Sequence, residues 1–167
     1  MQDEVKAQIM LRMQENLPRI QKCLDLLSQE QVWQKPNESS NSIANLILHL
    51  CGNITQYIHS SLGHQPDHRT RYEEFSTTSG LIKKELYSKI ETTINVASEI
   101  IKACSNEELQ RRRNVQGFTL TGIGCAIHVC EHLSYHVGQI ALLTKLMTNK
   151  DLGFYDGLDL NTKNDLI

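Results

Sequence analysis

The sequence predicts an all-α protein built as a four-helix bundle, in one domain that spans residues 1–167. Three observations support this fold class. Apolar side chains recur every three or four residues along four long stretches, which is the period of one buried helix face. Polar connectors separate these stretches, and the only strand signal, at residues 111–120, is weak. Four amphipathic helices of this length bury their apolar faces most simply against one another.

The first helix is expected over residues 3–28. Its buried stripe consists of Ile9, Met13, Ile20, Leu24 and Leu27. Pro18 lies inside this stretch and lacks a backbone N–H donor, so we expect a kink near Leu17. The polar segment that follows contains Pro36 and is expected to connect the first helix to the second.

The second helix is expected over residues 42–62, with Ser40, Asn41 or Ser42 as its N-cap. Its broad apolar face consists of Ile43, Leu46, Ile47, Leu50, Ile54 and Ile58. Gly63 follows this stretch, in the position of a glycine that ends a helix. The next segment combines proline, glycine and small polar residues, which predicts a loop.

The third helix is expected over residues 79–104, and residues 106–109 could add one short turn. The weak strand signal comes next. The fourth helix is expected over residues 120–149, where the early glycine Gly122 permits close packing against a neighbour. The tail after this helix is rich in glycine, aspartate and asparagine, so we expect irregular structure there.

The composition is that of an ordinary globular chain, with 40% hydrophobic residues, 22% charged residues and a formal net charge of −2. A slightly acidic chain does not indicate a nucleic-acid binder, and the one basic run, residues 111–113, suits a solvated turn. No apolar run approaches the roughly 18 residues that span a membrane. The first 20 residues mix acids with apolar residues, unlike a signal peptide.

The five cysteines are odd in number, form no CxxC pair and lie in apolar helical contexts. Cysteine in such contexts behaves as a small hydrophobic residue. We therefore expect reduced thiols in a cytoplasmic protein.

Histidines provide the clearest functional signal. His128, His132 and His136 stand at i, i+4 and i+8, so their rings share one helix face with a drift of about 40° per step. His49 lies on the second predicted helix, with an asparagine one turn before and one turn after it. Histidine is the commonest metal ligand, so two rings from one helix and one from another could form a metal site with open positions. A single histidine on an apolar face can also be a packing residue.

Other metal templates fit these residues less completely. Residues 128–132 read HVCEH, which matches the inverted zinc-protease motif with Glu131 as general base. That interpretation leaves His136 and His49 without a role. A di-iron carboxylate bundle needs Glu-x-x-His on two helices, whereas Glu131 is followed at that spacing by Ser134. A haem bundle stays open as an alternative, although the sequence shows no specific haem signal.

The stretches NSIANLILHLCGNITQYI, RTRYEEF and HVCEHLSYHVGQIALLTK resemble the DinB/YfiT-like superfamily, and more narrowly its DUF1572 branch. The resemblance covers nearly the whole chain, and the paired histidines followed by Gly-Gln are its most specific part. It implies an up-down-down-up four-helix bundle, often dimeric, with irregular loops and a C-terminal tail. It also implies a divalent metal held between one histidine of the second helix and two of the last.

Carried over by position, the metal ligands are His49, His132 and His136. Zinc or nickel is expected first, and iron or manganese also accept imidazole nitrogen. The candidates for catalysis are His128, Glu131 and Tyr135. The candidates for binding substrate, or for holding ligand rings and bound water, are Arg69, Arg71, Asn53 and Gln139. Arg69 and Arg71 could instead form salt bridges to Glu73 or Glu74 in a solvated loop.

The resemblance implies a metal-dependent enzyme, because relatives of this kind include S-transferases that use low-molecular-weight thiols such as bacillithiol or mycothiol. The expected partners are a small-molecule substrate, a thiol and a second copy of the chain, with no nucleic acid and no membrane. A metal-dependent hydrolase is the second hypothesis. The third is a non-enzymatic, stress-related dimeric binding module in which metal is structural or absent.

Overall fold

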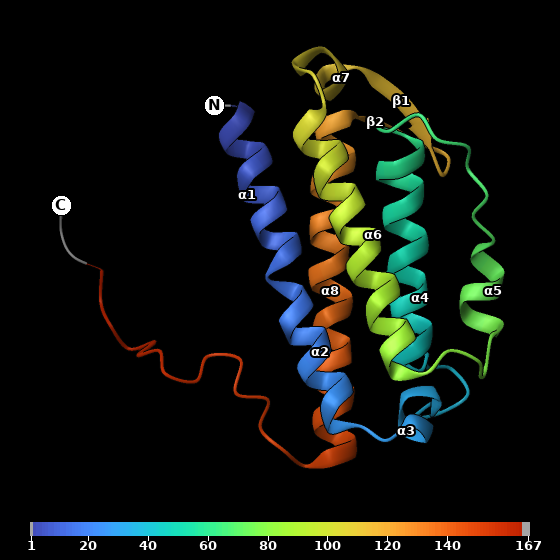
Figure 1. Cartoon of the computed structure of the whole chain (residues 1–167), viewed down its shortest axis with the longest axis vertical. Helices are drawn as coiled ribbons and strands as arrows, with labels where there is room; N and C mark the ends of the chain where they lie inside the picture. The colour runs from blue at the N-terminus through green and yellow to red at the C-terminus, as the bar shows by residue number, and fades with distance from the viewer. Residues whose placement is uncertain (1, 165–167) are drawn as a thin grey trace.

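The computed structural model describes residues 2–164 and shows four long helical segments side by side (Figure 1). The four segments are α1 (Gln2–Gln14) with α2 (Asn16–Leu26), α4 (Ile43–Ile54) with its π-helical continuation η1 (Thr55–Ser60), α6 (Lys83–Ala103), and α8 (Gly122–Thr148). In Figure 1, α1 and α2 run downward, α4 and α6 run upward, and α8 runs downward. Seen from the opposite end, these directions are up, down, down, up. The protein is therefore an all-α, up-down-down-up four-helix bundle, as the sequence predicted.

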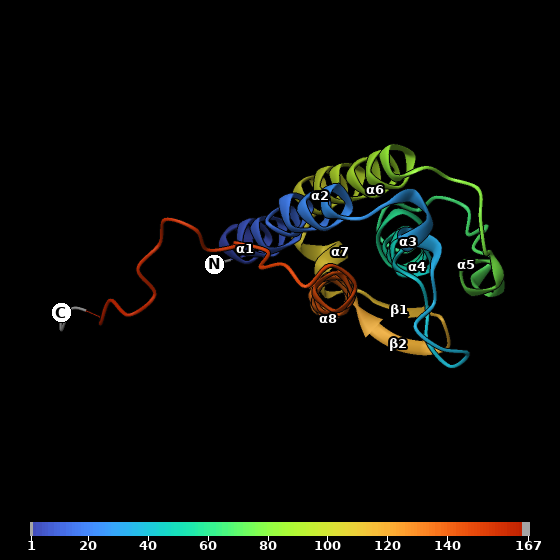
Figure 2. The same cartoon turned by 90° about the horizontal axis from the view of Figure 1, so that it is seen from below.

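Short elements occupy the two ends and one flank of the bundle. They are α3 (Gln29–Trp33), α5 (Arg71–Ser76), α7 (Asn106–Gln110), β1 (Arg112–Val115) and β2 (Phe118–Thr121). The two strands form an antiparallel hairpin, whose turn residues Gln116 and Gly117 have φ angles of 51° and 83°. Seen from below, α5 lies outside the bundle beside α4, and the hairpin lies near α4 and α8 (Figure 2).

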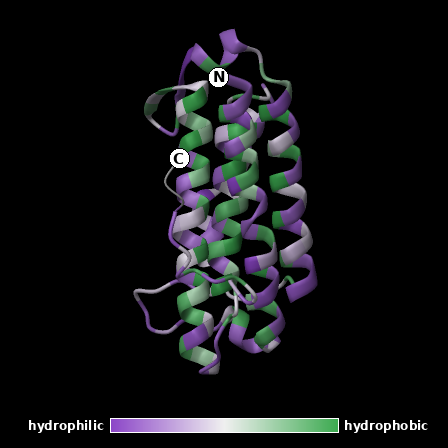
Figure 3. Ribbon diagram, turned by 90° about the vertical axis from the view of Figure 1, so that its left-hand side faces the viewer, coloured by the Kyte–Doolittle hydropathy of each residue, from purple (hydrophilic) through white to green (hydrophobic). Residues whose placement is uncertain are grey.

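The core receives fully buried apolar side chains from each of the four long segments. Examples are Met13, Ile47, Ile94 and Leu133. Hydrophobic and hydrophilic residues alternate along each helix, as expected when only one face is buried (Figure 3). None of the helices in the described part of the chain is long and apolar enough to cross a membrane.

The first predicted helix is kinked as expected, but the kink lies at Glu15, between α1 and α2, rather than near Leu17. Two features of the sequence explain why the interruption lies before the proline. Pro18 has no N–H to donate to the carbonyl one turn earlier. In addition, the side-chain amide of Asn16 donates to the carbonyl of Arg12 at 2.7 Å, in competition with the backbone. The helical ladder is therefore interrupted before the proline itself.

The second predicted helix ends differently from the expectation. The residue in the left-handed region is His64, with φ 55°, whereas Gly63 donates its N–H to the carbonyl of Ile58 at 2.8 Å. A Cβ at position 63 would lie 2.6 Å from the carbonyl oxygen of His59. Position 63 therefore needs a glycine because the backbone of His59 lies close to it, not because its φ angle is positive. At the other end of the helix, Ser42 is the N-cap and forms a reciprocal capping box with Asn45.

The predicted loop after the second helix contains a short helix, α5. The side-chain amide of Asn45 donates to the carbonyls of Glu74 at 2.9 Å and Thr77 at 2.7 Å, which ties α5 to α4. A six-residue helix has too few turns to be stable alone, so its formation depends on such tertiary contacts. The local sequence consequently gave no clear helix signal.

The later elements follow the predictions more closely. The expected turn at residues 106–109 is α7, and the weak strand signal corresponds to the hairpin. A Cβ on Gly122 would meet the carbonyl of Glu108 at 2.4 Å, so this glycine does permit close packing. The solvated turn expected at residues 111–113 is wrong for Arg113, which is largely buried and donates to the carbonyls of Ser61 and Glu108. The tail after α8 is irregular and extends away from the bundle (Figure 1).

Two lysines join the first helical segment to α6 at opposite ends of the bundle. Lys6 donates to the carbonyl of Cys104 at 2.6 Å, just past the end of α6. Lys83, the first residue of α6, donates to the carbonyls of Leu24 at 3.0 Å and Leu27 at 2.6 Å, where α2 ends. A cation at a helix C-terminus satisfies carbonyls that have no partner in the helix and complements the helix dipole.

We predict that Lys83→Met lowers the free energy of unfolding by about 1–2 kcal/mol, because the last carbonyls of α2 lose a charged donor. The exposed neighbour Lys84 provides a matched control, and Lys84→Met should change stability by less than about 0.5 kcal/mol. Urea unfolding followed by circular dichroism measures both. Equal effects of the two substitutions would contradict the capping role.

Candidate metal centre

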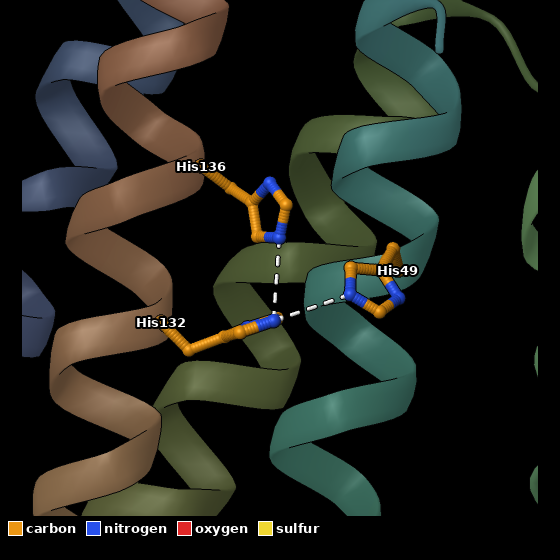
Figure 4. Close-up of side chains that lie close together, drawn as sticks. All are labelled: His49, His132 and His136. Carbon is orange, nitrogen blue, oxygen red and sulfur yellow. Dashed lines mark hydrogen bonds between the residues drawn. The ribbon is translucent and has the colours of Figure 1, made fainter. Parts of the chain in front are cut away.

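Three of the predicted site histidines meet in the interface between α4 and α8 (Figure 4). His49 comes from α4, and His132 and His136 come from successive turns of α8. His49 is buried, and the other two are partly buried. The spacing on α8 aligns two rings, and the antiparallel neighbour α4 supplies the third.

The Nε2 atoms of the three rings point at one another. His132 Nε2 lies 3.2 Å from His49 Nε2 and 3.2 Å from His136 Nε2. One ligand atom from each residue lies within 4.8 Å of those of the other two.

The outer nitrogens of two rings fix where their protons lie. His49 Nδ1 lies 2.8 Å from Glu74 Oε2, and a carboxylate can only accept, so this contact favours a proton on Nδ1 over one on Nε2. His136 Nδ1 likewise donates to Gln139 Oε1 at 2.7 Å. Both rings therefore present an Nε2 lone pair to the centre of the cluster.

This donor set fits a cation. His132 Nε2 can donate one proton at most, so it cannot satisfy two facing lone pairs, and its buried Nδ1 has no hydrogen-bond partner among the described residues. Two nitrogens bound at about 2.0–2.1 Å to one tetrahedral zinc ion lie about 3.4 Å apart, close to the 3.2 Å observed here. Three neutral imidazoles suit zinc, nickel, iron or manganese, so their assignment as metal ligands stays a prediction that this geometry supports.

A chain of polar contacts continues outward from His49. Arg69 donates to both carboxylate oxygens of Glu74, from Nε at 2.7 Å and from Nη2 at 2.9 Å. Arg69 also donates to Gln56 Oε1 at 2.8 Å. The side chains of Arg69 and Glu74 are only 3% and 9% exposed, so this ion pair is buried against α4. Of the alternatives for Arg69, the structure shows the salt bridge, though in a buried rather than a solvated setting.

Burial governs the electrostatics of the histidines on α8. It lowers the pKa of His132 to about 3, with further lowering by the neighbouring histidines and by Arg69. Burial also lowers the pKa of His136 against the opposing effect of the Gln139 hydrogen bond. For Glu74, burial alone would raise the pKa, but hydrogen bonds from Arg69 and His49 outweigh it and lower the pKa. At neutral pH, His132 and His136 are therefore neutral and the Glu74 carboxylate is ionised.

His128 lies one turn away from the cluster and does not join it. Its Nε2 faces the amide nitrogen of Asn53 at 3.3 Å, and its ring stacks on Tyr57 with 4.2 Å between centroids. Burial lowers the pKa of His128, so the ring is neutral at pH 7. The structure thus groups His49, rather than His128, with His132, unlike the pairing in the inverted protease motif.

Aromatic rings border the three histidines. The ring of Phe75 lies 4.7 Å from that of His49, and the exposed Tyr135 lies 5.0 Å from that of His136. Arg71 is exposed, with its guanidinium 4.9 Å above Phe75. Glu131 is exposed and has no side-chain hydrogen bond to the cluster among the described residues.

A cavity of about 280 Å³ lies beside the cluster, between the connector before α4 and the C-terminal half of α8. Its lining includes Leu46, Leu142 and Gln139, the last of which also contacts His136. None of the three histidines lines this cavity, so its connection to the cluster is the side chain of Gln139.

Sequence reasoning did not assign a site role to Glu74, Phe75 or Gly52. The first two lie on α5, whose position depends on tertiary contacts. Gly52 did carry a signal, since a glycine inside an apolar helix suggests a close approach by another group. A Cβ at position 52 would lie 1.9 Å from Glu74 Oε1.

We predict that the metal-free protein loses stability as pH falls below 6.5. The ordinary histidine pKa is 6.5, and the folded-state pKa values of His128, His132 and His136 are lower. The unfolded chain therefore binds more protons below pH 6.5, and the stabilisation present above that pH declines, for His132 over the range from 6.5 to about 3. Each histidine contributes at most about 1.4 kcal/mol per pH unit.

Chemical unfolding in the presence of a chelator, at pH 7.5, 6.0 and 5.0, measures this dependence. His132→Gln replaces the ring with a neutral side chain and should flatten it. A parent protein as stable at pH 5.0 as at pH 7.5 would contradict the prediction.

A family model described as a protein of unknown function, DUF1572, matches residues 4–155. The fold is similar to that of a DinB-like protein, YjoA, from Bacillus subtilis, with 20% identity, a TM-score of 0.67, and coverage of 89% of this chain and 96% of that chain. It is also similar to a DinB-like protein from Bacillus cereus, with 16% identity, a TM-score of 0.66, and coverage of 83% and 90%. No curated protein matches the chain. Because the family model covers most of its length, the chain belongs to the DUF1572 family.

Proposed function

We propose that this protein is a metal-dependent enzyme that transfers a low-molecular-weight thiol to small electrophiles. The observation that carries the proposal is the convergence of three Nε2 atoms from His49, His132 and His136 without a carboxylate among them. The resemblance to DinB-like S-transferases supplies the reaction class. Bacillithiol or a related cellular thiol is the cosubstrate that this analogy favours.

A divalent cation held by three neutral imidazoles would keep its full charge, polarise a carbonyl and lower the pKa of a coordinated thiol or water. In the proposed reaction, the thiol gives up its proton and its sulfur forms a bond to an electrophilic carbon. The leaving group departs with the electron pair of the bond that breaks.

The residues around the cluster suit a small organic substrate. Phe75 and Tyr135 provide aromatic surfaces next to two of the three histidines. The adjoining cavity adds apolar lining from Leu46 and Leu142. Arg71 is exposed, and its guanidinium lies over the ring of Phe75, whereas Arg69 is buried and paired with Glu74. We therefore propose that Arg71, rather than Arg69, binds an anionic group of the substrate.

His128 is the residue we propose for accepting the proton. Its ring is neutral at pH 7 and stacks near His132, with 5.4 Å between centroids. Asn53 and Tyr57 hold the ring in place. Glu131, the candidate base for a hydrolase, is exposed and has no hydrogen bond to the cluster among the described residues, so the geometry favours His128.

The proposal includes a cytoplasmic location, where the five free cysteines would stay reduced and small thiols are abundant. It also includes a homodimer, because α8 presents a row of exposed apolar side chains that a second copy could cover. These are Ile127, Tyr135, Leu142 and Leu146.

We predict close to one divalent metal per chain after the untagged protein is incubated with zinc, nickel, manganese or ferrous iron and then dialysed. His132→Ala should lose at least nine-tenths of this metal, because its Nε2 is the nitrogen shared by both close contacts. His128→Ala, on the same helix, should retain it. Elemental mass spectrometry gives the metal content.

An absence of metal from the parent under all four conditions would contradict both enzyme hypotheses and leave the binding module. Equal losses from the two alanine variants would instead show that His128 belongs to the metal site.

We predict that the metal-loaded protein accelerates the substitution of halide by bacillithiol on a halogenated nitrobenzene at least ten-fold over the uncatalysed reaction. His132→Ala should abolish the acceleration, and omitting the thiol should remove it as well. Absorbance of the conjugate measures the rate. Thiol-independent cleavage of a nitrophenyl ester would favour the hydrolase, and a metal-loaded protein with neither activity would favour the binding module.

A further inference from the structure

We propose that Glu74 is a positioning residue, which holds His49 in the form with its proton on Nδ1 and its Nε2 lone pair free. Gly52 is part of the same arrangement of His49, Glu74 and Arg69, because its lack of a side chain leaves the space that the carboxylate occupies. The inference rests on the proposed function only where it concerns metal affinity. The position of the proton on His49 can be measured in the metal-free protein.

The first step is that two groups of opposite character compete for His49 Nδ1. Glu74 Oε2 lies 2.8 Å from it and can only accept a hydrogen bond. Arg69 Nη2 lies 3.2 Å from the same atom and can only donate. The carboxylate is nearer, and its negative charge attracts the partly positive hydrogen of an N–H group. The proton therefore stays on Nδ1.

The second step is what happens without the carboxylate. Arg69 would then be the remaining charged partner of Nδ1, and its guanidinium would donate to that nitrogen. The ring proton would move to Nε2, the atom that faces His132. An Nε2–H group cannot be a metal ligand, so Glu74 decides whether His49 offers a lone pair to the cluster.

The third step concerns the approach of α5. Glu74 reaches His49 across the surface of α4 at Gly52, and its Oε1 would lie 1.9 Å from a Cβ there. Arg69 Nε would lie 3.0 Å from the same Cβ. Any side chain at position 52 would therefore push the ion pair away from His49. A substitution at Gly52 can thus test the role of Glu74 without altering a charged or titratable group.

The variants follow from these steps. Glu74→Ala and Gly52→Ala should each weaken zinc binding by about 10–100-fold. Glu74→Gln keeps an acceptor oxygen and should restore part of the affinity. Arg69→Met combined with Glu74→Ala removes the competing donor as well, and should bind zinc more tightly than Glu74→Ala alone.

Matched controls are available on α5 and α8. Glu73→Ala removes the adjacent carboxylate of α5, which is exposed and bonds Thr70 instead. Gly138→Ala adds a methyl group to α8 where no heavy atom lies within 4 Å. Both controls should bind zinc within two-fold of the parent. Thermal unfolding of every variant checks the fold, above all for Gly52→Ala, whose added methyl group displaces a buried ion pair.

The decisive readout is the proton position on His49 in the metal-free protein, from long-range ¹H–¹⁵N NMR correlations of the imidazole. The parent and both controls should show Nδ1–H. Glu74→Ala should show Nε2–H, because Arg69 then donates to Nδ1. Gly52→Ala displaces both members of the ion pair, so Nδ1–H should no longer predominate on His49.

Unchanged Nδ1–H in both variants, with zinc affinity within two-fold of the parent, would overturn the inference. A parent that binds no metal would overturn the proposed function instead, while the NMR comparison would still decide whether Glu74 sets the proton position.

Discussion

The antiparallel register of α4 against α8 is the constraint on which the site depends. Because the two helices run in opposite directions, a step of four residues forward on α4 meets a step of four residues back on α8. His49 therefore faces His132, and one turn further on Asn53 faces His128. A slip of one residue would rotate each ring by about 100° and separate the three Nε2 atoms. The caps and close contacts at the helix ends serve this register.

Several of these contacts have a second function at the site. The side chain of Asn45 caps the start of α4 and also bonds the carbonyls of Glu74 and Thr77 on the α5 side. Tyr57 stacks on His128 and donates through its hydroxyl to Gln116 in the hairpin turn at 3.0 Å. The peripheral elements therefore hold side chains beside the histidine cluster, and their placement is part of the site.

The bundle and the alignment of the histidines on α8 could be predicted from the sequence, because both depend on the periodicity of the helix. The four helices follow from apolar spacing, and the row of histidines on α8 follows from i+4 spacing alone. The asparagines that flank His49 correctly indicated a polar line, although their contacts differ: Asn45 holds α5 and Asn53 meets His128. The role of Glu74 could not be predicted, because α5 has no strong local signal and its position comes from contacts with α4. The kink at Glu15 likewise depends on a side-chain hydrogen bond, made by Asn16, that periodicity does not show.

The buried pair of Arg69 and Glu74 also bears on the chemistry that the cluster can support. A lone carboxylate beside His49 would orient the ring but would add negative charge next to the three nitrogens, weakening the effective charge of a bound cation. Arg69 cancels that charge through two hydrogen bonds while leaving the carboxylate free to accept from His49. On α8, the neutral amide of Gln139 does the same for His136 without any charge. Both outer contacts thus orient an imidazole and leave the local net charge near zero. A site built in this way suits Lewis-acid chemistry better than tight storage of a cation, for which uncompensated carboxylates would serve better.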